Sequence, residues 1–296
     1  MFYKFCLSKH KINEVDFNLI LIYFKYLILT KGFTYSTIKC HRSALADPFK
    51  LIFGSDIFEH IKFQLLFKFS RSNSFKVDNF FPLWDLDKVL GFLTSANFVK
   101  LAESDNSWLI KKYLFLVAIA ASRRISEFQA LSLNETYFNS DGSVNLNPHN
   151  KFLAKNHTHN FKPKPIPIPP LTRNDICPVQ ALRNYINLSH NICEKLSITR
   201  SERLWIDIKG KPLTKNHIRH YFRSVILQAD PNARLEDTKF HSARKVASSQ
   251  VYRHFDIDSV MSSLCWKSSS TFFKHYQKFG LKTSSPAVVA GRVINT

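Results

Sequence analysis

Glycine is scarce in this chain, with only 7 residues among 296. Loops that cradle nucleotide phosphates depend on closely spaced glycines, and the sequence contains neither a Walker fingerprint nor a dinucleotide-binding fingerprint. The shortage of glycine therefore argues against an enzyme that binds nucleotides through such a loop.

Cysteine is also rare, and no two cysteines stand at C-x-x-C spacing. Such a pattern is typical of reduced thiols inside a cell, and it argues against a zinc site or a disulfide framework. His149, His157 and His159 lie near one another, but no cysteine or carboxylate set accompanies them at ligand spacing. We therefore expect no metal and no disulfide. The five cysteines are Cys6, Cys40, Cys177, Cys193 and Cys265.

Long apolar runs are missing as well. The run 19–29 is interrupted by Lys25, and the run 113–121 is far shorter than the roughly 20 residues that a membrane span needs. No cleavage site follows an apolar run near the N-terminus, so we expect no signal peptide. The sequence predicts a protein that stays inside the cell, in the nucleus if the host is a eukaryote and otherwise in the cytoplasm.

Acidic residues are outnumbered, since 42 lysines and arginines stand against 22 aspartates and glutamates and give a net charge of +20. Residues 1–84 carry 12 basic and 6 acidic side chains, and residues 85–296 carry 30 and 16. Such a charge favours polyanions through counterion release and long-range attraction. Because both parts are basic, a partner that touches both is favoured over one that binds a single basic tail.

The length and the 45% hydrophobic content favour two domains, each with a core of its own. We place a helical domain at 1–80, whose polar, turn-rich end at about 70–80 is the predicted linker. It contains an apolar helix near 16–30, a turn at 31–32 and a helix from about Ser36. On the latter, Lys39 and Arg42 are candidates to face DNA, although an ordinary solvated face explains them equally well.

The second predicted domain, 81–296, starts with helices and includes a buried one at 108–121. The pattern then changes, with a turn signal at Asp141-Gly142 between short extended runs. Residues 152–155 and 163–169 are predicted to be two further strand segments. Prolines at alternate positions from 163 to 169 leave amide donors on one side only, so this segment must be an edge strand. We predict a mainly α (α+β) protein with a small antiparallel sheet of about three strands and helices over 178–280.

Four short motifs carry the chemistry. In chain order they are Arg124-Ile-Ser-Glu127, His241-Ser-Ala-Arg244, Trp266 and Tyr276. Two guanidiniums can clamp phosphate oxygens through charge-assisted hydrogen bonds, and a phenol can attack phosphorus to form a covalent ester. This order therefore indicates metal-free breakage and rejoining of a phosphodiester.

The chain resembles the tyrosine recombinase (phage integrase) family over about residues 15–280. Within this family it is similar to the DIRS-like and Crypton recombinases of eukaryotic mobile elements. Three blocks carry the resemblance, and the stretch 32–45 is more loosely similar to the family's core-binding domain. The blocks are Ala121-Ser-Arg-Arg-Ile-Ser-Glu-Phe-Gln-Ala-Leu131, His241-Ser-Ala-Arg-Lys-Val-Ala-Ser-Ser249 and Leu264-Cys-Trp-Lys-Ser-Ser-Ser-Thr-Phe-Phe-Lys-His-Tyr276.

The resemblance implies a role for each motif residue. Arg124 and Arg244 would clamp the phosphate, with Glu127 holding the first guanidinium, while Trp266 would donate its indole N–H. Tyr276 would be the nucleophile and His241 the group that relays its proton. A lysine in the hairpin would protonate the leaving oxygen; Lys155 fits best, and Lys151, Lys162 and Lys164 are rivals. Cys265 departs from the glycine that many relatives carry.

The implied function is a DNA recombinase or integrase that works through a 3′-phosphotyrosine link, without metal or cofactor. Its implied partners are double-stranded DNA and three further copies of itself, in a tetramer on two duplexes. Lys215 and Arg219 are further candidate DNA contacts. A type IB topoisomerase uses nearly the same residue types, but the chain is short for one and Trp266 stands where a histidine is expected. A DNA-binding remnant of a mobile element that has lost activity remains the non-enzymatic alternative.

Overall fold

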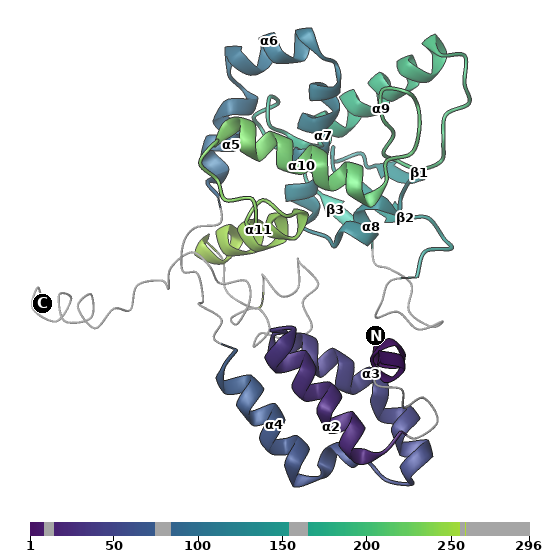
Figure 1. Cartoon of the computed structure of the whole chain (residues 1–296). Helices are drawn as coiled ribbons and strands as arrows, with labels where there is room; N and C mark the ends of the chain where they lie inside the picture. Colours follow the sequence, from purple (N-terminus) through teal and green to yellow (C-terminus); the bar gives the residue numbers. More distant parts are fainter. Residues whose placement is uncertain (9–14, 75–83, 154–164, 255–257, 259–296) are drawn as a thin grey trace, which may run out of the picture. The chain divides into compact units, whose positions relative to one another are not determined.

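The computed structural model describes residues 1–8, 15–74, 84–153, 165–254 and 258. The chain divides into two compact units, Met1–Asn79 and Phe80–Thr296, each with its own hydrophobic core (Figure 1). Helices form most of both units, and a small antiparallel sheet lies in the second, which confirms the predicted fold class. In the described part of the chain, no helix is both long and apolar enough to cross a bilayer.

The first unit is entirely helical where it is described. The apolar stretch predicted near 16–30 is a helix that continues into a wider π-helical turn, and Gly32 then reverses the chain with φ 62°. The elements are α1 (Phe2–Ser8), α2 (Phe17–Lys25), η1 (Tyr26–Thr30), α3 (Tyr35–Phe53), η2 (Ile57–Glu59) and α4 (Ile61–Ser72).

Phenylalanine rings fill the core of the first unit. Phe24 of α2 meets the rings of Phe58, Phe63 and Phe67 edge-on at centroid distances of 5.5, 5.9 and 5.3 Å. Edge-to-face contacts of this kind are favourable beyond the burial of area alone. They explain how so many aromatic residues pack within a short helical domain.

The predicted linker at about 70–80 begins too early. Helix α4 continues to Ser72, and Ser70 is buried. The hydroxyl of Ser72 donates to the Lys68 carbonyl at 3.0 Å, and that of Ser74 to the Ser70 carbonyl at 2.7 Å. Serine is typical of loops, but a serine hydroxyl can also donate a hydrogen bond to a carbonyl of the preceding helical turn. The serine-rich composition therefore predicted a linker where the helix continues.

The second unit wraps its helices around α7, which is buried along most of its length, as the sequence predicted. Its core is continuous from Trp84 through α7 to the faces of α9, α10 and α11. The helices are α5 (Leu86–Leu93), α6 (Ala96–Ser104), α7 (Ser107–Ala121), α8 (Ile125–Gln129), α9 (Pro178–Lys195), α10 (Lys215–Ala229) and α11 (Phe240–His254). The strands are β1 (Leu131–Phe138), β2 (Val144–Pro148) and β3 (Ile166–Ile168).

The sheet has the order β1-β2-β3, and both pairs are antiparallel. Gly142, with φ 81°, makes the turn between β1 and β2 that the Asp-Gly pair predicted. Among the described strands, β3 lies at the edge of the sheet, as predicted, and Pro167 can offer no amide donor to a further strand. The strand predicted at 152–155 is wrong for 152 and 153: the Phe152 amide donates to the His149 carbonyl at 2.9 Å in a turn after β2.

Candidate active site

Arg124 stands at a sharp turn between two helices. Helix α7 ends at Ala121, and Ser122 follows in the left-handed region with φ 47°. The Ser122 hydroxyl donates to the Ile119 carbonyl at 2.8 Å and closes this turn. Arg124 then takes an extended backbone as the N-cap of α8. The arginine therefore belongs to the start of α8.

Glu127 lies beside Arg124. Its Oε1 is 3.5 Å from the Arg124 Nη1, and the two side chains are 16% and 48% exposed respectively. A carboxylate one turn along the helix restricts the orientation of the guanidinium, while the exposed part of the fork keeps donors accessible to an incoming anion. The geometry suits an arginine that is held ready for a phosphate.

His241 and Arg244 lie on the first turns of α11 but differ in their surroundings. His241 is exposed, whereas Arg244 is only 5% exposed. Ala243 and Val246 of the same helix are buried. A guanidinium in such a position has already lost most of its water, so its hydrogen bonds to an anion are stronger than those of a solvated arginine.

Aromatic rings join the two elements that carry these residues. Phe128 of α8 meets Phe240, the residue before His241, at a centroid distance of 5.3 Å. Phe128 also stacks on Trp205 at 5.0 Å, and Phe240 meets Phe222 of α10 at 5.3 Å. All four rings are buried. The packing therefore brings α8, which follows Arg124, into contact with the first residue of α11.

Three predicted catalytic residues, Lys155, Trp266 and Tyr276, lie outside the described residues, as do the rival lysines Lys162 and Lys164. The remaining rival, Lys151, is exposed, and its amide donates to the Nδ1 of His149 at 3.1 Å. The assignment of the nucleophile, the indole donor and the general acid therefore remains a prediction from the sequence.

The predicted DNA contacts of the first unit differ from each other. Lys39 is an exposed residue of α3. Arg42 is half-buried: its guanidinium lies 5.6 and 5.5 Å from the ring centroids of Phe58 and Phe67, and 3.9 Å from the Asp56 carboxylate. Arg42 thus has a packing role that the sequence did not predict.

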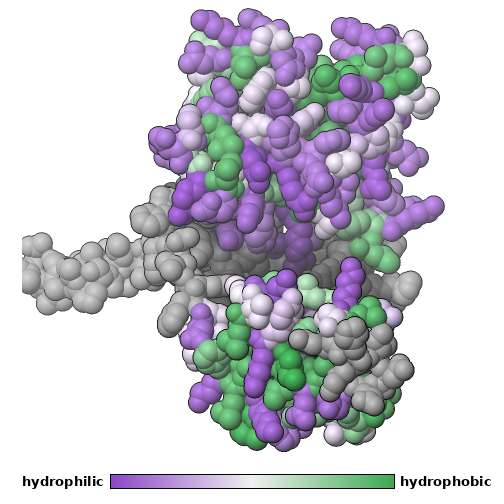
Figure 2. All heavy atoms as spheres, in the orientation of Figure 1, coloured by the Kyte–Doolittle hydropathy of each residue, from purple (hydrophilic) through white to green (hydrophobic). Residues whose placement is uncertain are grey.

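Helix α10 carries the predicted contacts of the second unit. Lys215 and Arg219 are both exposed, and the Arg219 Nη1 donates to the Asn216 side chain at 2.8 Å. His217 and His220 are also exposed on this helix. Figure 2 shows hydrophilic residues over most of the visible face of the second unit, where α10 lies in Figure 1. The two units are described separately, so the four predicted contacts do not form one described site.

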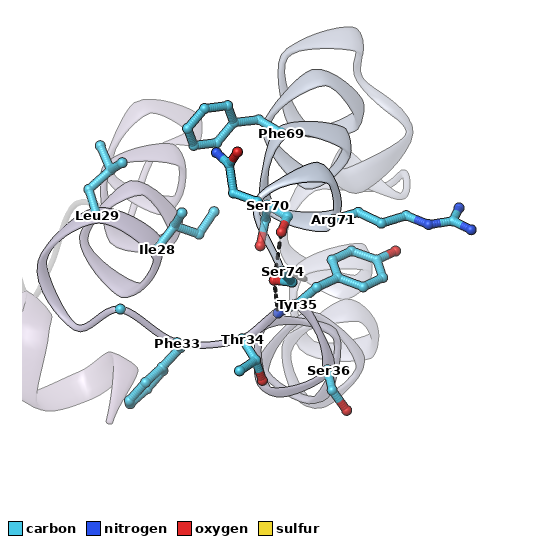
Figure 3. Close-up of a pocket in the computed structure, with 12 residues that line it drawn as sticks. Ile28, Leu29, Phe33, Thr34, Tyr35, Ser36, Phe69, Ser70, Arg71 and Ser74 are labelled. Atoms are coloured by element: carbon cyan, nitrogen blue, oxygen red, sulfur yellow. Dashed lines mark hydrogen bonds between the residues drawn. The ribbon is translucent and has the colours of Figure 1, made fainter. Parts of the chain in front are cut away.

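A hollow of about 600 Å³ lies in the first unit, between η1, the start of α3 and the end of α4 (Figure 3). The Ser74 hydroxyl accepts from the Tyr35 amide at 2.8 Å and donates to the Ser70 carbonyl, which ties the two helices together. Arg71 extends away from the hollow in Figure 3. Sequence reasoning missed this link, because nothing in the local pattern pairs Tyr35 with Ser74.

Two lysines of α7 have a lowered pKa. Burial lowers the pKa of Lys111, an effect that nearby Asp105 opposes, and burial likewise lowers that of Lys112. The Lys111 Nζ lies 4.0 Å from the centroid of the Trp108 ring, and the Lys112 Nζ donates to the Leu93 carbonyl at 2.8 Å. Both cations therefore support the packing of α7. Among the described residues, no group of three or more His, Cys, Asp or Glu side chains is placed to hold a metal.

A protein-family model matches most of the second unit. The phage integrase family matches residues 92–279, which is more than half of the chain and includes all the predicted catalytic positions. No curated protein is similar enough to match the chain.

Solved structures share the fold at low sequence identity. XerH site-specific recombinase, bound to a palindromic difH substrate, aligns with 99% of this chain and 76% of its own, at 14% identity and TM-score 0.59. The Tn1549 transposon integrase in complex with transposon right end DNA covers 96% and 87%, at 13% identity and TM-score 0.58. A lambda integrase dimer bound to a COC′ core site covers 94% and 88%, at 12% identity and TM-score 0.52.

Proposed function

Because the chain belongs to the phage integrase family of tyrosine recombinases, we propose that it cleaves and rejoins DNA strands at a specific site through a 3′-phosphotyrosine intermediate. The observation that supports this proposal is the Arg124–Glu127 pair on α8 together with the contact of α8 with the start of α11 through Phe128 and Phe240. The two arginines compensate the charge that grows on the phosphate, so the reaction needs no metal.

In the proposed first step, the phenol oxygen of Tyr276 forms a bond to phosphorus while the bond from phosphorus to the 5′-oxygen breaks. His241 relays the phenol proton, and Lys155 supplies a proton to the departing 5′-oxygen. Arg124, Arg244 and the indole N–H of Trp266 hold the non-bridging oxygens.

Rejoining reverses this step with the 5′-hydroxyl of another strand. One phosphate ester replaces another in each direction, so the bond energy is conserved and no nucleotide cofactor is consumed.

Double-stranded DNA is the proposed partner. The related XerH, Tn1549 and lambda structures are themselves complexes with DNA. The net charge of +20 and the exposed Lys39, Lys215 and Arg219 favour the same partner here. We further propose a tetramer on two duplexes, an origin in a mobile element and, in a eukaryotic host, action in the nucleus.

A nicked suicide substrate tests the proposed function. Cleavage close to a nick releases a short fragment, so the 5′-hydroxyl is lost and the covalent protein–DNA adduct accumulates on a denaturing gel. Tyr276→Phe keeps the ring but removes the nucleophilic oxygen, and we expect it to form no adduct while DNA affinity stays within a few-fold. An undiminished adduct in this variant would disprove the role of Tyr276. Tight binding without any adduct in the unmodified protein would instead identify an inactive, DNA-binding relative.

A further inference from the structure

Trp84 makes a buried hydrogen bond to the helix that carries His241 and Arg244. Its indole Nε1 donates to the Ser242 Oγ at 2.8 Å, although the two residues are 158 positions apart in the sequence. Trp84 is 3% exposed and stands directly before Asp85, the N-cap of α5. The bond therefore connects the start of the second unit to the start of α11.

The indole ring is fixed by its neighbours. It meets Phe115 of α7 at a centroid distance of 5.8 Å and Phe222 of α10 at 6.0 Å, edge-on to the latter. Phe115 and Phe222 stack on each other at 5.0 Å. Because the ring is held by two helices, its N–H has a defined direction, and Ser242 is the acceptor that it meets.

Ser242 lies between the two candidate catalytic residues. It follows His241 directly and precedes Arg244 by two positions, and its amide donates to the Lys239 carbonyl at 2.7 Å in the turn that begins α11. Consecutive residues of an α-helix are about 100° apart around the axis, so an anchor on Ser242 fixes the rotation of this turn. The rotation in turn decides where His241 and Arg244 project.

We infer that Trp84 is a positioning residue for His241 and Arg244, an inference that rests on the proposed function. Trp84 holds the first turn of α11 through Ser242 and touches no reacting atom itself. Catalytic groups act through geometry held to within about 0.5 Å, and a displacement of about 1 Å can cost about 100-fold in rate. The hydrogen bond between Trp84 and Ser242 is uncharged, so it can hold the first turn of α11 in place without adding a charge beside the phosphate.

Trp84→Phe tests the inference, because it keeps an aromatic ring and removes the N–H donor. Adduct formation is measured on two suicide substrates, one with the natural scissile phosphate and one with a methylphosphonate there. The methylphosphonate has no negative charge, so it depends much less on a correctly placed guanidinium. We expect the rate on the phosphate to fall about 10-fold, and the rate on the methylphosphonate to fall by less than about 3-fold.

Trp108→Phe is the matched control. Trp108 is a half-buried residue of α7 that packs against the same core, and its ring lies 4.0 Å from the Lys111 Nζ. Loss of ring volume there should slow both substrates equally, so the ratio of the two rates should stay at the value of the unmodified protein. An equal loss on both substrates in Trp84→Phe would show that Trp84 only stabilises the fold and would overturn the inference.

Ser242→Ala is a second, independent test. It removes the acceptor of the same hydrogen bond and is a smaller change than Trp84→Phe. It should reproduce the altered rate ratio, and the Trp84→Phe, Ser242→Ala double variant should be no worse than the more severe single variant. Additive losses would also overturn the inference.

If the unmodified protein forms no adduct, the proposed function fails and the positioning role fails with it. If it forms the adduct and both single variants form it equally fast, only the positioning role fails.

Discussion

At the scale of single residues, the pair of Arg124 and Glu127 offers the most direct test of the clamp. Arg124→Ala removes a donor aimed at developing charge, and we expect adduct formation to slow about 100-fold or more. Glu127→Gln leaves the arginine in place but loosens its orientation, so we expect a smaller loss of about 3- to 10-fold. Both rates are measured as adduct formation under single-turnover conditions.

The exposed ion pair of Arg173 and Asp175, at 2.8 Å, provides the control for that test. Asp175→Asn removes a carboxylate from an arginine outside the candidate site and should leave the rate unchanged. Cleavage by the unmodified protein should also persist in EDTA. Loss of cleavage on chelation and its return with added magnesium would contradict a clamp made of arginines alone.

At the scale of elements, the hydrogen bonds at the start of α7 predict how the stability of the fold depends on pH. The Asp105 carboxylate accepts hydrogen bonds from the Ser107 amide and hydroxyl at 2.8 and 2.5 Å. Those bonds, chiefly the one from the hydroxyl, and the nearby Lys111 lower the Asp105 pKa below 3.8. A lowered pKa stabilises the folded state above 3.8, and the contribution disappears as the pH falls through the folded-state value.

Asp105→Asn should therefore unfold at lower urea concentration at neutral pH. The carboxylate is 48% exposed and screened by solvent, so we expect a loss of only about 0.5–1 kcal/mol. The gap between the variant and the unmodified protein should close as the pH falls below 3.8. The exposed Glu103 of α6 serves for comparison, because Glu103→Gln should leave the midpoint nearly unchanged. A gap that persists undiminished in acid would contradict the electrostatic explanation.

Periodic elements were predictable from the sequence, whereas the contacts between them were not. The buried α7, the turn at Gly142 and the edge strand β3 each follow from local rules of burial, backbone freedom or missing amide donors. The prediction failed at Ser70–Ser72 because serine hydroxyls can bond to helix carbonyls and so remain within a helix. It failed at Phe152 because the amide of that residue bonds within a turn and not to another strand.

The candidate site divides in the same way. The arginine and histidine motifs were found because their spacing is local, and Glu127 was found because it lies one turn from Arg124. Trp84 was missed, since a hydrogen bond across 158 residues leaves no periodic signal. The packing role of Arg42 was missed for a similar reason: its partners Asp56, Phe58 and Phe67 lie on other elements.

At the scale of the whole molecule, the charge predicts how binding responds to salt. Residues 1–84 and 85–296 are both strongly basic, with 12 against 6 and 30 against 16 charged side chains. Each phosphate neutralised by a lysine or arginine releases condensed counterions, so the logarithm of affinity should fall against the logarithm of salt with a slope of about −0.9 per contacted phosphate. Lys215→Gln and Arg219→Gln should each reduce that slope by about 1 if these side chains touch phosphates.

Dividing the chain tests whether both units bind the same duplex. The fragments 1–79 and 80–296 follow the boundary between the two compact units. When two modules bind one duplex, the second binds at an effective concentration set by the connection, which reaches about the millimolar range for a short linker. We therefore expect the intact chain to bind a duplex at least about 100-fold more tightly than either fragment, and with a steeper salt slope, in titrations monitored by fluorescence anisotropy. Circular dichroism establishes beforehand that each fragment is folded. A fragment that equals the intact chain in both affinity and slope would show that one unit alone contacts DNA, and the shared-duplex arrangement would then be wrong.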